Sequence, residues 1–285
     1  MIEQKWQDKM KALGLYGLMV HADSIEKLID IPSLIQWEEE VRAERGLKNR
    51  LKLAKLGEFK SIADFDWKFP TKCDRLQIEE YLKADFVREA MNLVILGPNG
   101  AGKSMIACNI AYQAVLGGHT ALFVKASQML NDLESQGGTH DLNRRLKYYS
   151  TPELLIADEI GFLSYSNAHA DLLFEIIARR YEKKSTIVTT NKAFVEWDQI
   201  FPNASCVVSL IDRIIHRSDM IHIEVPYSYR LKEAKERDVK RQKSKNKKSH
   251  LPLAVVDNEK NTQETETVLE QTPDEPCHNT IKECE

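Results

Sequence analysis

The chain has few of the features that mark secreted or membrane proteins. Its five cysteines form neither a zinc-type pairing nor the dense, even pattern of a disulfide-rich secreted domain. No stretch approaches the roughly 18 consecutive apolar residues that a membrane-spanning helix needs, and the charged N-terminus has no apolar signal core. We therefore expect a soluble protein of the reducing cytoplasm that makes no contact with a membrane.

Charge is nearly balanced overall but is unevenly distributed. The formal net charge is −3, yet residues 232–248 hold nine Lys or Arg against three acids, and residues 251–285 hold nine acids against two lysines. Aromatic side chains are almost absent from residue 235 onward, so this stretch cannot bury enough surface to offset its ordering entropy. We predict that residues 235–285 form a mostly disordered tail, basic and then acidic.

Apolar periodicity divides the rest of the chain in two. Residues 1–63 follow a helical pattern, which predicts a small helical N-terminal domain, and an aromatic linker that includes Phe65, Trp67 and Phe69 then breaks the period. In residues 64–234, apolar runs alternate with helical segments, which favours an α/β fold with a parallel sheet covered on both faces. Strands are expected at residues 93–96, 121–124, 154–157, 186–189 and 220–225.

One eight-residue segment has the complete spacing of a phosphate-binding loop and lies between a predicted strand and a predicted helix. Its glycines let backbone N–H groups turn toward phosphate oxygens, and the following helix presents its positive end to the same anion. Lys103 would reach the terminal phosphates, and Ser104 would ligate magnesium. We predict that ATP and Mg²⁺ bind through Gly97, Pro98, Asn99, Gly100, Ala101, Gly102, Lys103 and Ser104.

Two adjacent carboxylates, Asp158 and Glu159, end an apolar run where a core would gain nothing from them. Asp158 fits the carboxylate that holds magnesium through its waters, and Glu159 fits the base that polarises the attacking water in phosphoryl transfer. The non-catalytic alternative is a pair of helix N-cap residues after the strand. Together with the phosphate loop, the pair predicts an ATPase.

Three further polar residues are weaker candidates for the same site. Asn191 follows an apolar run and could position the attacking water, although Thr-Asn at a strand end is also ordinary turn chemistry. Arg213 could stabilise the transition state in a neighbouring subunit, but spacing alone favours a surface ion pair with Asp212. Arg230 could touch the nucleotide or only solvent.

Two groups of basic residues lie between the core elements. Either could contact DNA phosphates, and either could be a solvated helix face, which is the commoner case. The first group is Arg144, Arg145 and Lys147, and the second is Arg179, Arg180, Lys183 and Lys184.

A set of short motifs occurs in one order between Met10 and Arg237. The motifs are residues 97–104, 154–162, 180–182, 189–191, 194–197, 210–213 and 228–232. This set resembles the IstB-like ATPases, the AAA+ helpers of insertion-sequence transposases, which are similar to the bacterial helicase loader DnaC. The chain departs from that pattern at Ala157, where the family usually carries a bulkier residue or Asp, and in the acidic tail after Lys248.

The resemblance implies an AAA+ fold with a parallel five-stranded sheet. It also implies that Asn191 is the first sensor, Arg213 an arginine finger acting in trans, and Arg230 the second sensor. Proteins of this family assemble on duplex DNA as ATP-dependent oligomers, deform it and stimulate a partner transposase, and their N-terminal domain serves self-assembly and partner contact.

Two other classes of function compete with this one. A loader of a replicative helicase is nearly indistinguishable at the core. A small-molecule kinase or a passive nucleotide switch is disfavoured by Arg213 and by the Asp158–Glu159 pair.

Overall fold

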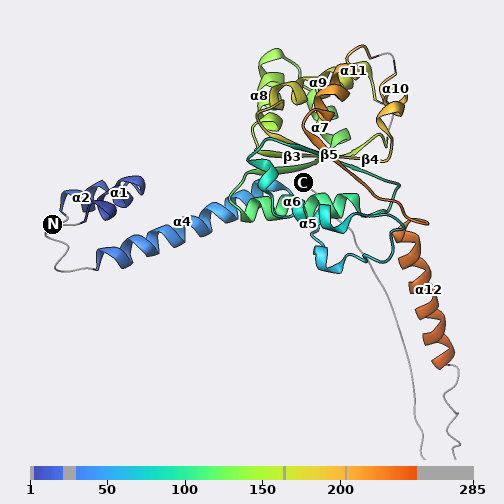
Figure 1. Ribbon diagram of the computed structural model, residues 1–285, viewed down its shortest axis with the longest axis horizontal. Helices are drawn as coiled ribbons and strands as arrows, with labels where there is room; N and C mark the ends of the chain where they lie inside the picture. Colours follow the sequence, from blue (N-terminus) through green and yellow to red (C-terminus); the bar gives the residue numbers. More distant parts are fainter. Residues whose placement is uncertain (1–2, 22–29, 163–164, 203, 249–285) are drawn as a thin grey trace, which may run out of the picture. The chain divides into compact units, whose positions relative to one another are not determined.

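The computed structural model describes residues 3–21, 30–162, 165–202 and 204–248, with side chains described as far as residue 239 (Figure 1). Residues 1–237 form one compact unit. Most of the predicted tail, residues 249–285, lies outside the described part of the chain. The first part of the predicted tail, residues 235–248, belongs to the last helix, which ends at Lys248.

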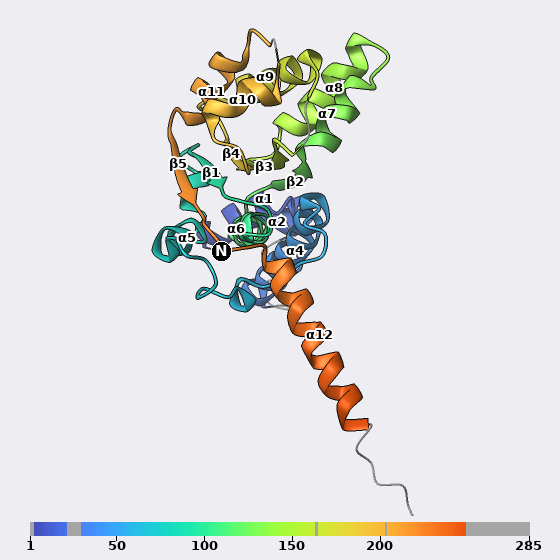
Figure 2. The ribbon, with the colours of Figure 1, turned by 90° about the vertical axis from the view of Figure 1, so that its right-hand side faces the viewer.

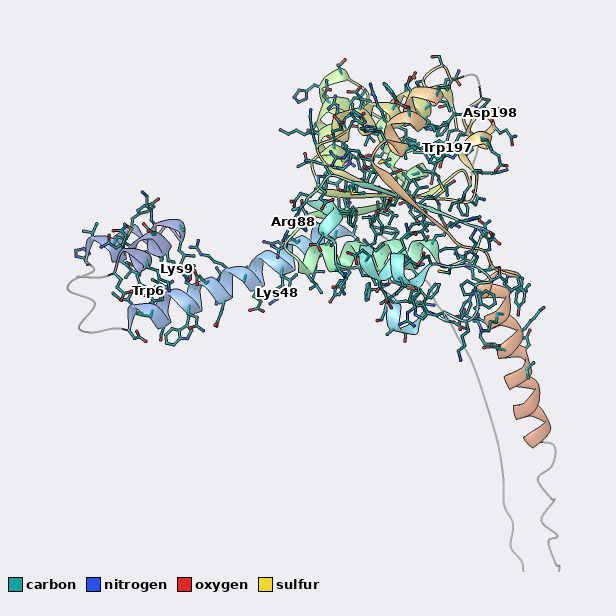
Figure 3. All side chains as sticks on the ribbon, viewed as in Figure 1. Trp6, Lys9, Lys48, Arg88, Trp197 and Asp198 are labelled. Atoms are coloured by element: carbon teal, nitrogen blue, oxygen red, sulfur yellow. The ribbon has the colours of Figure 1, made fainter. Side chains whose placement is uncertain are left out.

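Three helices form the N-terminal part of the described chain: α1 (Gln4–Ala12), α2 (Tyr16–Val20) and α4 (Ile31–Ala54). Met10 of α1 is buried against Ile31 and Ile35 of α4, with Trp6 packed on the same cluster. An ion pair of 2.8 Å between Lys9 Nζ and a Glu39 carboxylate oxygen also links α1 to α4 (Figure 3). The end of α4 packs on the nucleotide-binding core, where Ala54 is fully buried. One long helix therefore belongs to both parts.

The core is a sheet of five parallel strands: β1 (Asn92–Leu96), β2 (Ala121–Lys125), β3 (Leu154–Ile160), β4 (Ser185–Thr190) and β5 (Ser218–His222). The strand order is β2-β3-β4-β1-β5. Together with the phosphate loop after β1, this sheet confirms the predicted AAA+ α/β fold. The predicted end of the last strand at residue 225 was wrong, because β5 ends at His222 and Glu224 instead pairs antiparallel with Lys72.

One helix of the core precedes β1, and the others lie between the strands or after the last one. Their bounds are α5 (Arg75–Tyr81), α6 (Lys103–Leu116), α7 (Ala126–Glu134), α8 (Thr139–Ser150), α9 (Asn167–Arg180), α10 (Trp197–Ile200), α11 (Val207–Ile215) and α12 (Tyr229–Lys248). Short 3-10 turns occupy Ile62–Asp64, Asp85–Val87 and Phe194–Glu196.

Alternating side chains of β1, β2, β3 and β4 enter two separate hydrophobic clusters, as strand geometry requires. Val94 and Leu155 point into the cluster shared with α7, α8, α9 and α11, whereas Leu93 and Ile156 point into the cluster shared with α5 and α6. The helices therefore cover both faces of the sheet (Figure 2). This double cover explains why the strands read as nearly continuous apolar runs.

Arg180, the last residue of α9, is buried with 1% of its surface exposed. Its guanidinium donates to the Thr186 hydroxyl at 3.0 Å and to five main-chain carbonyls, those of Tyr149, Ser150, Pro152, Glu153 and Ser185. Burial lowers the pKa of Arg180 to about 9. The prediction that Arg180 belongs to an exposed basic group, on DNA or in solvent, was wrong, because this cation joins α8, α9 and the start of two strands.

Candidate ATP-binding site

The phosphate loop connects β1 to α6, as the sequence predicts. Gly100 has a φ of +76°, and a Cβ there would lie 2.1 Å from the Ser228 hydroxyl oxygen. A Cβ on Gly97 would lie 2.4 Å from the Ile223 carbonyl oxygen. Only glycine fits at these two positions, because backbone and side chains of the C-terminal segment approach the loop so closely.

Lys103 lies in the first turn of α6 and is 5% exposed. Its Nζ donates to the Gly97 and Pro98 carbonyls at 2.7 and 2.9 Å. Burial lowers the pKa of Lys103 to about 8, although the charges of Asp158 and Glu159 act in the opposite direction. The ammonium is thus held inside the loop, where phosphate oxygens can replace the two carbonyls as its partners.

This low pKa predicts that ATP binding takes up a proton in alkaline solution. Without nucleotide, Lys103 is mostly neutral above about pH 8, and bound phosphates favour its charged form, which raises its pKa. Calorimetric titration at pH 9 in buffers of different ionisation enthalpy should show uptake approaching one proton, and at pH 7.5 far less. Lys103→Arg, which stays charged, should remove the uptake. Uptake near zero for the wild type at pH 9 would contradict the prediction.

Asp158 and Ser104 come together at the carboxyl end of the sheet. One Asp158 oxygen accepts hydrogen bonds from the Ser104 hydroxyl at 2.8 Å and from the Thr189 hydroxyl at 2.6 Å. Asp158 is 2% exposed, and burial raises its pKa. The N-cap alternative was wrong, because α9 begins several residues later and is capped by Ser166. A hydroxyl and a carboxylate beside a phosphate loop form the donor set that Mg²⁺ takes with nucleotides.

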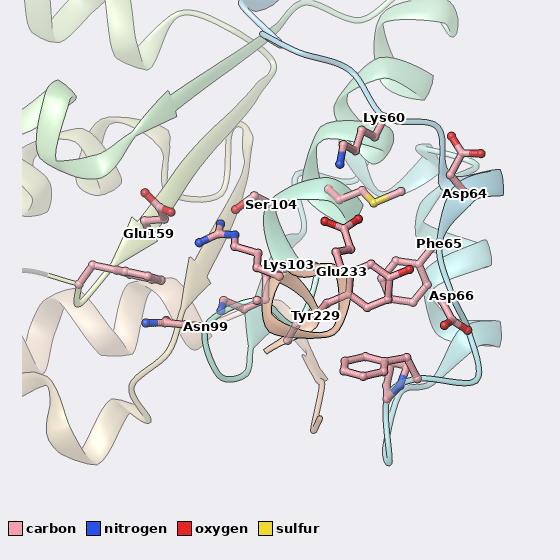
Figure 4. Close-up of a pocket in the computed structure, with 18 residues that line it drawn as sticks. Lys60, Asp64, Phe65, Asp66, Asn99, Lys103, Ser104, Glu159, Tyr229 and Glu233 are labelled. Carbon is pink, nitrogen blue, oxygen red and sulfur yellow. The ribbon is translucent and has the colours of Figure 1, made fainter. Parts of the chain in front are cut away.

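Glu159 follows with a φ of +63°, at a point where the register between β3 and β4 shifts. This left-handed turn brings its side chain to the wall of the cavity, on the same side as Lys103 and Ser104 (Figure 4). Its carboxylate lies 2.8 Å from Lys125 Nζ at the end of β2. Sequence reasoning missed Lys125, because the pair depends on β2 and β3 being neighbours.

The phosphate loop opens into a cavity of about 470 Å³ (Figure 4). Its other wall comes from the aromatic linker and the first turns of α12: Asp64, Phe65, Asp66, Phe69, Pro70, Tyr229, Arg230 and Glu233. The Lys232 ammonium bonds Asp66 at 2.6 Å and lies 5.0 Å from the centre of the Phe69 ring. The linker thus encloses the space beside the loop where the rest of a nucleotide would lie, a role that the sequence did not reveal.

The three weaker candidates occupy different places. Arg230 lines the cavity and is exposed. Asn191 directly follows β4, and its buried Oδ1 has no hydrogen-bond partner among the described residues. Within the same described residues, Arg213 makes no ion pair with Asp212; its guanidinium carbon instead lies 4.3 Å from the centre of the Phe174 ring. Neither Asn191 nor Arg213 is among the described residues that line the cavity.

The sheet order, the loop between β1 and α6 and the carboxylate pair on β3 define an ATP-binding protein of the AAA+ class. The chain belongs to the family of IstB-like ATP binding proteins, whose family model matches residues 19–237. No helix within the described residues is long and apolar enough to cross a membrane.

The chain is similar to proteins named as belonging to insertion sequences. One, from insertion sequence IS21 of Pseudomonas aeruginosa and named for ATP binding, is 36% identical over 205 residues, covering 72% of this chain and 77% of the relative. A similarly named protein from insertion sequence IS232 of Bacillus thuringiensis is 34% identical over 207 residues, covering 72% and 82%. Among solved structures, that of DnaI has a TM-score of 0.47 at 20% identity and covers 58% of this chain and 88% of DnaI.

Proposed function

We propose that the protein is an ATP-hydrolysing, DNA-binding member of this family that assembles on target DNA, remodels it and stimulates a partner transposase. The observation that carries the hydrolytic part is the placement of Glu159 on the cavity wall next to the Asp158–Ser104 contact and the buried Lys103. The transposition context is supported by relatives that belong to insertion sequences.

Each residue of the site has a distinct task in this proposal. Lys103 exchanges the loop carbonyls for the terminal phosphates and neutralises their charge. Ser104 and Asp158 would hold Mg²⁺, which supplies further neutralisation of the phosphates when bound. Glu159 accepts a proton from the attacking water. Asn191, whose buried Oδ1 has no hydrogen-bond partner within the described part of the chain, orients that water, and Arg230 contacts the phosphates from the α12 side.

Self-association would complete the site through Arg213 of a neighbouring subunit. Arg213 does not line the cavity of its own chain, and two apolar side chains on the same helix are exposed, Val208 by 79% and Ile215 by 45%. Because Val208 and Ile215 are seven residues apart, both lie on one face of α11, and we propose that a second subunit covers this face. We therefore place the subunit interface at α11.

Mixing two inactive variants tests whether sites are shared. Lys103→Ala removes the cation of one site, and Arg213→Ala removes the finger that would serve the next subunit, so each variant alone should hydrolyse ATP poorly. A mixture should regain a substantial part of wild-type phosphate release, because some interfaces then combine an intact loop with an intact Arg213. The control is each variant at the total protein concentration of the mixture. A mixture no more active than its components would argue against a shared site.

The partner is contacted, in our proposal, through the N-terminal helices, which expose Tyr16, Val20 and Trp37 by more than half of their surface. A helicase loader would use the same ATPase core, so this surface is where the two functions differ. We favour the transposase because of the relatives' insertion-sequence context.

A further inference from the structure

Helix α12 begins at the ATP cavity and continues beyond the compact unit of residues 1–237. Tyr229 and Arg230 line the cavity, and the Tyr229 backbone N–H donates to the Gly100 carbonyl at 3.1 Å. Both the compact unit and the match to the family model end at Arg237, whereas α12 extends to Lys248. The extension is therefore a feature of this chain that the family's ATPase core does not explain.

The described side chains of α12 that lead into this extension gain little stability from packing. All described side chains from Lys235 to Val239 are exposed, so this part of α12 is not packed on the core. The ion pair of Arg237 with Glu233, at 4.0 Å just before the extension, is a surface contact, and such contacts contribute little. A helix that is polar all round and unpacked is marginal unless something else stabilises it.

The charge of the extension points to that stabiliser. Residues 239–248 contain six Lys or Arg and no Asp or Glu. Like charges four residues apart, such as Arg241 with Lys245 and Lys243 with Lys247, destabilise an isolated helix. A polyanion removes this repulsion and gains free energy by releasing its counterions. A basic helix is also the form in which many proteins contact the phosphates of duplex DNA.

The sequence beyond this helix carries the opposite charge. After Ser249 and His250, residues 251–285 hold nine acids and two lysines, a net charge of 2 − 9 = −7 against +6 for residues 239–248. Because the two segments are adjacent in the chain, the effective concentration of one at the other is on the order of millimolar. A duplex that binds these cations weakly would have to compete for them with the acidic segment.

We propose that residues 239–248 bind the phosphate backbone of DNA and that the acidic segment 251–285 competes for the same cations. This inference rests on the DNA binding in the proposed function and adds to it a second contact outside the ATPase core. The competition weakens the binding of a duplex that contacts only these cations. It has little effect on a duplex that also contacts the ATPase core when ATP is bound.

The test measures fluorescence anisotropy of a labelled duplex with the full-length protein and ATP, at several salt concentrations. The basic variant changes Lys240, Arg241, Lys243, Lys245, Lys247 and Lys248 to Gln. The acidic variant changes Asp257, Glu259, Glu264, Glu266, Glu270, Asp274, Glu275, Glu283 and Glu285 to the corresponding amides. A third variant combines both sets. A matched control changes Arg42, Arg45, Lys48, Arg50, Lys52 and Lys55, in and just after α4, to Gln.

We expect the basic variant to bind at least about tenfold more weakly and to lose up to about 5 from the slope of log K against log salt. The acidic variant should bind more tightly than the wild type, and its gain should vanish in the combined variant. A basic variant that keeps the wild-type slope, or a control that loses as much, would overturn the proposed site. A gain that persists in the combined variant would overturn the competition. Failure of both the wild type and the acidic variant to bind duplex would instead overturn the DNA binding of the proposed function.

Discussion

Glu159→Gln is expected to reduce ATP hydrolysis by about 100-fold or more while ATP binding is retained. The amide keeps the shape of the side chain on the cavity wall but cannot accept a proton from water. Lys103, Ser104 and Asp158, which are the predicted phosphate and magnesium contacts, are unchanged. Phosphate release and the binding of a fluorescent ATP analogue, measured on the same preparation, separate the two effects.

The matched control for this variant is Lys125→Met. Both substitutions break the ion pair between Lys125 and Glu159, but only the glutamine variant removes the base. The methionine variant should therefore keep hydrolysis within about tenfold of the wild type. If both variants lose activity equally, the ion pair and not the carboxylate would be responsible. A glutamine variant with nearly normal hydrolysis would remove Glu159 from the proposed mechanism.

Arg180→Met is expected to lower the free energy of unfolding by about 3 kcal/mol or more. The substitution leaves five carbonyls and the Thr186 hydroxyl without this donor in a buried region, and each buried unpaired group costs about 1–3 kcal/mol when solvent cannot replace the bond. Methionine fills much of the same space, so the loss reports mainly the hydrogen bonds. Urea unfolding followed by circular dichroism measures it.

Arg179→Met is the control for this second prediction. Arg179 precedes Arg180 in α9 but pairs with Glu175 at 2.7 Å on the surface, where such pairs contribute about 1 kcal/mol or less. We expect its unfolding free energy to change by no more than that. Equal losses for the two variants would contradict the bridging role assigned to Arg180.

Much of the fold follows from local patterns in the sequence. The starts of four of the five strands were predicted to within one residue, because strands buried on both faces read as apolar runs such as Leu93 to Leu96 and Leu154 to Ala157, although β3 continues three residues beyond its predicted end to Ile160. The phosphate loop was evident from its spacing alone. The proximity of Ser104 and Asp158 followed from the fold, because the phosphate loop before Ser104 and the carboxylate pair on β3 both lie at the carboxyl edge of one parallel sheet.

Other features depend on which segments meet in space, and the sequence does not encode this locally. Arg180 belongs to a group of basic residues whose charge predicts an exposed helix face. Only the packing of α8 and α9 shows that Arg180 is buried. Phe65 and Phe69 were recognised as a linker but not as a cavity wall, because their partners on α12 are more than 150 residues away. The roles of Asn191, Arg213 and Arg230 remain predictions, as do the assembly of an oligomer and the binding of DNA.

The central claim is that this site hydrolyses ATP in the service of DNA binding. Phosphate release by the wild-type protein, measured with and without duplex DNA and without any other phosphate acceptor, tests it most directly. We predict turnover that duplex DNA stimulates and that Lys103→Ala abolishes under both conditions. Turnover that duplex DNA leaves unchanged, or that the Lys103→Ala protein retains, would contradict the account.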